Sequence, residues 1–246
     1  MVSEKTNLRS RGIYLLPNLF TSGALFSGFY AITSAMNNHF ETAVIAIFVA
    51  MILDGLDGRV ARMTNTQSEF GAQYDSLSDM VSFGVAPALV MYLWAFGDMG
   101  RVGLFAAFVH TAGAALRLAR FNTQLETADK RYFQGLPSPA AAAIIAGFIW
   151  ICLEHDYELE VIKFPALVLI LSTGLLMVSN FRYSSFKQID LKGKVPFIAA
   201  IAMMLAIAFV MAQPQTMLFL LFLVYAISGP VITLIQRKRI LQERKN

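Results

Sequence analysis

Residues 54–79 have the sequence DGLDGRVARMTNTQSEFGAQYDSLSD, which places four aspartates within an otherwise strongly apolar chain. Asp54 and Asp57 are three residues apart and Asp75 and Asp79 are four apart, so each pair lies on one face of a helix. A short polar turn over about residues 63–70 joins the two predicted helices, which must therefore run antiparallel. We expect the two acidic faces to converge on one site.

The four carboxylates predict a divalent-metal site. No cysteine or histidine lies between residues 54 and 79, and an oxygen-only donor set suits Mg²⁺, Mn²⁺ or Ca²⁺ rather than Zn²⁺. The stretch lacks the alternating ligands and closing glutamate of an EF-hand, which excludes that class. Gly58, Ala61 and Gly71 remove side-chain bulk beside the carboxylates, as an approaching phosphate or nucleotide would require. The alternative is an ion or solute carrier that uses the same acidic cluster.

Composition independently indicates an integral membrane protein. Hydrophobic residues make up 57% of the 246 residues and charged residues 15%, with a mean hydropathy of +0.58, outside the balance of a soluble globular domain. We predict an all-α bundle of about eight transmembrane helices. The apolar segments are residues 13–36, 42–56, 77–96, 102–120, 137–153, 164–179, 195–212 and 216–235.

The predicted organisation is a single transmembrane catalytic domain over residues 1–246. Its core covers about residues 13–194, followed by two further spans over about 195–235 and a basic tail over 236–246. The lone Cys152 excludes an intramolecular disulfide. His110, near the middle of the fourth span, is either a hydrogen-bonded packing residue or a functional group.

The distribution of lysine and arginine predicts the orientation. If both termini are cytoplasmic, every lysine and arginine faces the cytoplasm except Arg101 and Lys163. This is a strong positive-inside bias, and it places the aspartates at the cytoplasmic side of the membrane. The same bias accounts for the net charge of +4, so nucleic acid is not implied as a partner.

The aspartate frame resembles a known family. Asp54, Asp57, Gly58, Ala61, Arg62, Gly71, Asp75 and Asp79, at these spacings, are similar to the motif of the CDP-alcohol phosphotransferases, without departure at any of the eight positions. Three further stretches resemble the bacterial, membrane-spanning members that use CDP-diacylglycerol and serine. They are DSLSDMVSFGVAP (residues 75–87), RLARFN (117–122) and FQGLPSPAAA (133–142). The resemblance covers about residues 16–194.

The resemblance implies an enzyme that transfers the phosphatidyl group of CDP-diacylglycerol to an alcohol and releases CMP. It implies two divalent cations, Mg²⁺ or Mn²⁺ with Ca²⁺ as a bound substitute. Asp54, Asp57 and Asp75 are then chiefly ligands, and Asp79 is the general base and a further ligand. The expected CDP-diacylglycerol contacts are Asn18, Thr21, Gly58, Ala61, Arg62 and Gly71.

The acceptor implied by the resemblance is L-serine, with inositol phosphate, glycerol 3-phosphate or choline as alternatives. Arg117 and Arg120 are three residues apart at a helix end, where they present two cations to a carboxylate or phosphate. Cytoplasmic anchoring is the alternative role for this pair. Asn122 and Ser138 are candidates for further hydrogen bonds to serine. Membrane lipids and a second copy of the chain, in a homodimer, are the other expected partners.

Overall fold

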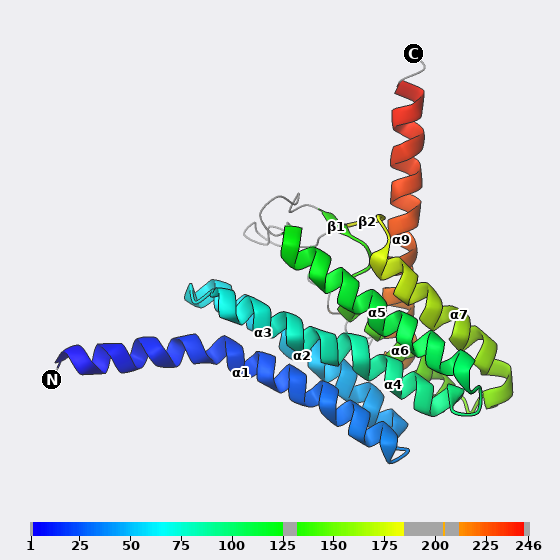
Figure 1. Ribbon diagram of the computed structural model, residues 1–246, viewed down its shortest axis with the longest axis horizontal. Helices are drawn as coiled ribbons and strands as arrows, with labels where there is room; N and C mark the ends of the chain where they lie inside the picture. The colour runs from blue at the N-terminus through cyan, green and yellow to red at the C-terminus, as the bar shows by residue number, and fades with distance from the viewer. Residues whose placement is uncertain (1, 125–131, 185–203, 205–211, 244–246) are drawn as a thin grey trace.

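The computed structural model describes residues 2–124, 132–184, 204 and 212–243, and most of these residues are helical. The chain begins with the antiparallel pair α1 and α2 and ends with the long helix α9, which extends beyond the rest of the bundle (Figure 1). The helices are α1 (Val2–Met36), α2 (Phe40–Thr64), α3 (Glu69–Asp79), α4 (Ala86–Met91), α5 (Arg101–Gln124), α6 (Ser138–Glu154), α7 (Leu159–Val178) and α9 (Pro214–Glu243). A π-helical segment, η1 (Met80–Val85), joins α3 to α4, and a second one, η2 (Tyr92–Phe96), continues α4, so that Glu69–Phe96 is one continuous helix.

Five helices in the described part of the chain are long and apolar enough to cross a membrane. They cover Leu16–Met36, Glu69–Phe96, Arg101–Thr123, Leu159–Val178 and Pro214–Ile235. The predicted spans over 42–56 and 137–153 correspond to α2, which carries two of the aspartates, and to α6, which is 17 residues long. The predicted span over 195–212 lies almost wholly outside the described residues. The membrane class is therefore confirmed, whereas the count of eight spans stays a prediction.

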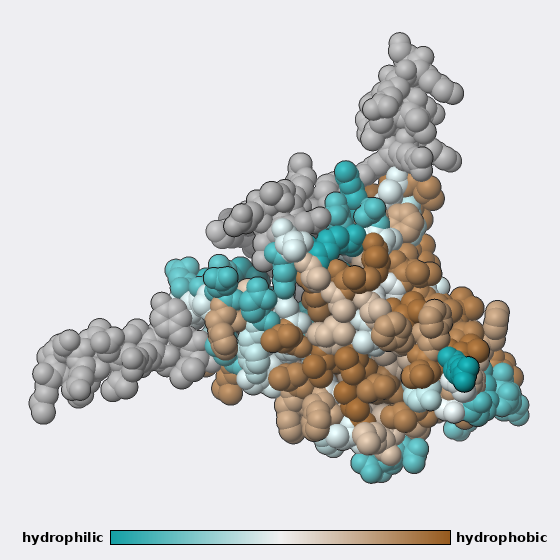
Figure 2. Space-filling view, in the orientation of Figure 1, coloured by the Kyte–Doolittle hydropathy of each residue, from teal (hydrophilic) through white to brown (hydrophobic). Residues whose placement is uncertain are grey.

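Apolar side chains cover the middle of the visible face, and polar ones gather at its two ends (Figure 2). Helix α3 begins at one of these ends (Figure 1). The same end carries a two-stranded ribbon of β1 (Tyr132–Gln134) and β2 (Arg182–Ser184). The ribbon is antiparallel and pairs Phe133 with Tyr183. The visible face is therefore polar at both ends and apolar between them, as expected of a protein that crosses a bilayer (Figure 2).

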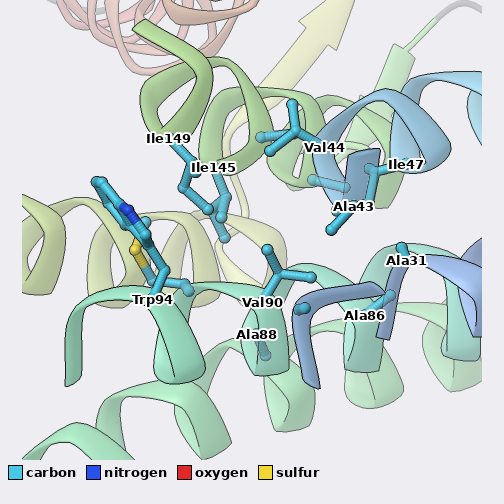
Figure 3. Close-up of a cluster of buried hydrophobic side chains, with 14 of the residues drawn as sticks. Ala31, Ala43, Val44, Ile47, Ala86, Ala88, Val90, Trp94, Ile145 and Ile149 are labelled. Atoms are coloured by element: carbon cyan, nitrogen blue, oxygen red, sulfur yellow. The ribbon is translucent and has the colours of Figure 1, made fainter. Parts of the chain in front are cut away.

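Small side chains form much of the buried core between α1, α2, α4 and α6 (Figure 3). Ala31 of α1, Ala43 of α2 and Ala86 of α4 are completely buried, and Val90 and Ile145 fill the space between the helices. Helices in lipid associate through such close packing, because burial of apolar surface gains little there. The alanine-rich sequence thus explains how the four helices approach one another closely.

His110 is part of this packing and compensates for a proline. Pro87 has no backbone N–H, so it cannot donate to the carbonyl of Phe83 four residues earlier. The buried His110 ring supplies that donor, with Nε2 at 3.1 Å from the Phe83 oxygen and Nδ1 at 3.0 Å from Thr173 Oγ1. A carbonyl only accepts, so Nε2 carries the proton. These contacts support the packing role for His110.

Candidate active site

The aspartates converge as their spacing predicts. The turn between α2 and α3 is short, with Asn65 in the left-handed conformation at the end of α2 and the Ser68 side chain accepting from the Gly71 N–H at the start of α3. One carboxylate oxygen each from Asp54, Asp57 and Asp75 lies within 4.8 Å of the other two. Asp79 follows one turn further along α3, beside the carboxyls of Asp54 and Asp75.

The donor set fits a divalent cation. Three carboxylates held this closely and partly buried repel one another unless a cation lies between them. The Oδ1 atom of Asp75 is buried and has no hydrogen-bond partner among the described residues. A buried acceptor without a partner is costly in free energy, and a metal ion at the cluster would satisfy it. The residues present therefore suit an oxygen-ligated metal.

Thr21 orients one of the aspartates. Its buried hydroxyl donates to Asp57 Oδ2 at 2.6 Å. The carbonyl oxygen of Pro17 is a second possible acceptor, at 3.1 Å from Thr21 Oγ1. A threonine hydroxyl has one hydrogen, so the shorter contact to the charged acceptor is the stronger one. Thr21 was expected among the donor contacts, and in the structure it touches a metal-ligand candidate directly.

A second polar stripe attaches α3 and η1 to α1. It consists of Tyr74, Ser78 and Ser82, which are spaced four residues apart. Tyr74 and Ser78 directly precede Asp75 and Asp79, and Ser82 lies three residues after Asp79. The Tyr74 hydroxyl lies 2.8 Å from Ser22 Oγ, and the two serines donate to carbonyls of α1. Sequence analysis missed this stripe, although its period of four is the same as that of Gly71, Asp75 and Asp79. It holds the acidic face of α3 at a fixed rotation.

The other expected donor contacts lie around the cluster. A β-carbon at Gly71 would be 3.6 Å from Asn18 Oδ1, so α1 and α3 approach each other there. A β-carbon at Gly58 would be 3.6 Å from Arg62 Nη1, which shows that the exposed arginine folds back over the glycine. Ala61 is partly buried on the same helix. The expected donor residues therefore surround the aspartates on α1, α2 and α3.

Arg117 of α5 is a buried cation that interacts electrostatically with Asp79. Its side chain is 8% exposed, Nη1 donates to Ser138 Oγ at 3.1 Å, and Nε has no hydrogen-bond partner among the described residues. The Asp79 carboxyl is its acidic neighbour. The structure thus brings together two of the expected acceptor residues, Arg117 and Ser138, and connects them to the candidate base.

Arg120 has different surroundings from Arg117. It donates to acceptors at the end of α7 and on β1, namely the carbonyls of Met177, Val178, Ser179 and Gln134 and the Asn180 side chain. Gly135 makes this arrangement possible, since its φ is +77° and a β-carbon there would be 2.1 Å from the Met177 oxygen. Arg120 therefore satisfies carbonyls that the end of a helix leaves open.

Asn122 is engaged with α3. Its amide exchanges hydrogen-bonding contacts of 3.1 and 3.2 Å with Ser76 Oγ. Ser76 directly follows Asp75 in the chain, so Asn122 joins the end of α5 to the acidic helix. Of the four acceptor candidates, Arg117 and Ser138 lie together, whereas Arg120 and Asn122 each bind a neighbouring element.

Comparison with known proteins shows the family of this chain. The family model for CDP-alcohol phosphatidyltransferase matches residues 14–209. A CDP-diacylglycerol-serine O-phosphatidyltransferase of Helicobacter pylori (strain J99) is 39% identical over 218 residues, which is 87% of this chain and 90% of the relative. Proteins of the same name from Methanocaldococcus jannaschii and Bacillus subtilis are 39% and 34% identical, over 74% and 70% of this chain and 80% and 92% of those relatives.

Proposed function

This chain belongs to the CDP-alcohol phosphatidyltransferase family, and we propose that it transfers the phosphatidyl group of CDP-diacylglycerol to the hydroxyl of L-serine. The products are phosphatidylserine and CMP. Relatives named for this reaction, at up to 39% identity, support serine as the acceptor. Asp79 carries the proposal, because this carboxyl interacts both with the metal-ligand candidates Asp54 and Asp75 and with the buried guanidinium of Arg117.

The donor half of the site is the acidic cluster with its surrounding residues. Asp54, Asp57 and Asp75, together with Asp79, would hold Mg²⁺ or Mn²⁺, and the closeness of the carboxylates supports this assignment. A pair of such cations, when bound, neutralises phosphate charge and makes the phosphorus easier to attack. Gly58, Ala61 and Gly71 leave room for the nucleotide, and Arg62 and Asn18 offer polar contacts at its edge.

The acceptor half begins at Asp79. This carboxylate takes the hydroxyl proton of serine as the serine oxygen forms its bond to the phosphorus that carries diacylglycerol, and the bond from that phosphorus to CMP breaks. Arg117 holds the serine carboxylate, and Ser138 keeps the guanidinium in place. Arg120 and Asn122 support the site, by closing the end of α7 and by binding Ser76 respectively.

We further propose a single catalytic domain in the bacterial inner membrane, with the aspartates facing the cytoplasm and the chain paired as a homodimer. The charge distribution along the sequence supports the orientation. Soluble serine and CMP would then exchange on the cytoplasmic side, and the acyl chains would remain in the bilayer.

A panel of acceptors tests the function. Purified protein in detergent receives CDP-diacylglycerol, Mn²⁺ and one of serine, glycerol 3-phosphate, inositol phosphate or choline, and CMP and lipid product are measured. We expect CMP release with serine that EDTA abolishes and that Mn²⁺ or Mg²⁺, but not Zn²⁺, restores. A guanidinium also suits phosphate, so stronger turnover with a phosphorylated alcohol would reassign the acceptor. Solute movement without CMP release would indicate a carrier.

A further inference from the structure

The buried guanidinium of Arg117 has more donors than its protein partners use. An arginine offers five N–H groups, and the hydrogen bond found for this side chain in the described residues goes from Nη1 to Ser138. Its Nε is buried without a partner there. A cation in this state is costly unless an anion completes its hydrogen bonds. The arrangement therefore points to a ligand anion at Arg117, and the residues around the guanidinium decide which anion fits.

One of those residues comes from the C-terminal helix. Tyr225 of α9 lies within electrostatic range of the Arg117 guanidinium, although residue 225 is outside the stretch that the family model matches. The helix is firmly docked at this level, since Ala226 is 3% exposed and a β-carbon at Gly147 of α6 would be 3.0 Å from Phe219. The phenol is thus held at a defined place beside the arginine.

Tyr183 of β2 packs against the ring of Tyr225. The two ring centroids are 5.5 Å apart, and the buried Tyr183 hydroxyl donates to the carbonyl of Ala226 at 3.0 Å. A β-carbon at Gly229 would be 2.3 Å from the Tyr183 ring, which shows how closely α9 and β2 approach. Of the two tyrosines, Tyr183 has a structural role, and it serves as a matched control for its neighbour.

We propose that Tyr225 is a specificity residue of the acceptor pocket and that its hydroxyl donates to the carboxylate of a small hydroxy amino acid bound by Arg117. This inference rests on the proposed function and adds α9 to the site. A phenol hydroxyl is a hydrogen-bond donor that suits a carboxylate. An acceptor held at this end presents its hydroxyl to Asp79, the acidic neighbour of the same arginine.

The proposal also implies a small acceptor. Arg117 and Asp79 interact electrostatically, so an acceptor whose carboxylate binds Arg117 and whose hydroxyl meets Asp79 carries both groups on one small molecule. Serine meets this condition. Tyr225 and Ser138 are both close to the guanidinium, so a carboxylate there meets a second and a third hydrogen-bonding group besides the arginine.

Steady-state kinetics of Tyr225→Phe and Tyr183→Phe test this proposal in the full-length protein with Mn²⁺ and CDP-diacylglycerol. Tyr225→Phe keeps the ring against Tyr183 and removes only the hydroxyl. We expect its KM for serine to rise on the order of tenfold, as for loss of a hydrogen bond to a charged group, with kcat and the KM for CDP-diacylglycerol nearly unchanged. Tyr183→Phe should lower the melting temperature and leave the serine KM as in the wild type.

The outcomes distinguish failure of the role proposed for Tyr225 from failure of the proposed enzymatic activity. An unchanged serine KM in a folded Tyr225→Phe protein would overturn the role of Tyr225 while the activity itself stands. Equal effects on both substrates, accompanied by a lowered melting temperature as in Tyr183→Phe, would also overturn it, because they would indicate a structural role. Failure of the wild-type protein to release CMP with serine would instead overturn the proposed function.

Discussion

At the scale of single residues, the environment of each aspartate indicates how the four divide their roles. Asp54, Asp57 and Asp75 have oxygens within 4.8 Å of one another, and Asp57 is also held by Thr21. Asp79 lies one turn further along, next to Arg117. The first three therefore suit metal ligation, and we propose that the fourth is the general base for the acceptor hydroxyl.

Substituting asparagine separates these roles. Asp79→Asn should lower turnover by about 10²–10⁴-fold, the usual contribution of a general base, while CDP-diacylglycerol still binds. Asp75→Asn should weaken Mn²⁺ binding and thereby abolish activity. Glu69→Gln, in the exposed first turn of the same helix, is the control and should change neither. CMP release and Mn²⁺ titration measure the two effects, and near-normal turnover of Asp79→Asn would place the base elsewhere.

The two arginines of α5 should also behave differently. Arg117→Ala removes a charge-assisted contact worth about 1.5–3 kcal/mol, so the serine KM should rise by about one to two orders of magnitude. Arg117→Lys should lower the serine KM only part of the way back to the wild-type value, because an ammonium lacks the bidentate geometry of a guanidinium. Arg120→Ala should lower the melting temperature without a matching change in the serine KM, since its donors close the end of α7. A large rise in the serine KM of Arg120→Ala would show that Arg120 binds the acceptor.

At the scale of elements, close backbone contact fixes how α5 lies against α7. A β-carbon at Gly113 would be 2.5 Å from the carbonyl oxygen of Gly174, and one at Gly174 would be 2.9 Å from that of Val109. These are contacts with backbone atoms, which cannot turn away as a side chain can. His110 and Thr173 add a hydrogen bond at the same level. The position of Arg117, one turn beyond Gly113 on α5, depends on this contact.

Gly113→Ala tests that dependence. The added methyl group has no room, so the free energy of unfolding should fall by about 1–3 kcal/mol, as for other overpacked sites. Gly97→Ala is the matched control, because a β-carbon at residue 97 has nothing within 4 Å. Thermal unfolding in detergent measures both variants. Equal stability of Gly113→Ala and the wild type would show that the two helices can separate at little cost.

At the scale of the whole molecule, the ends of the bundle differ in charge. The candidate site lies at the end where α2 stops and α3 starts, and α7 starts at the opposite end. At that opposite end Lys163 binds Asp98 and Glu160, and the hydrogen bond from Lys163 lowers the pKa of Asp98. One of the two cations predicted to face outward is thus neutralised locally. The proposed orientation puts this end outside the cell and the end with the candidate site in the cytoplasm.

Thiol labelling checks the orientation. The native Cys152 is buried, so the unmodified chain should react little with a membrane-impermeant maleimide. Gln67→Cys, in the exposed turn before α3, should label only after the cells are opened, whereas Glu158→Cys, in the exposed turn before α7, should label in intact cells. The reverse pattern, or labelling of both from the same side, would overturn the proposed orientation.

The sequence by itself determined the membrane class, the antiparallel pairing of α2 and α3, and the convergence of Asp54, Asp57 and Asp75. These features follow from hydropathy and from a period of three to four residues, which are local properties of the chain. The predicted end of α2 near residue 63 agrees with its observed end at Thr64.

Only the tertiary structure decided which partner each polar side chain meets. Arg117 and Arg120 are one turn apart on the same helix, yet one lies beside Asp79 and the other closes α7. Thr21 reaches Asp57 across 36 residues of sequence, and His110 reaches Thr173 across 63. Tyr225 interacts electrostatically with Arg117, although it lies on a helix that no sequence motif connects to the site. Such contacts depend on how the helices rotate and pack, and buried polar groups must then use whichever partners that packing brings near.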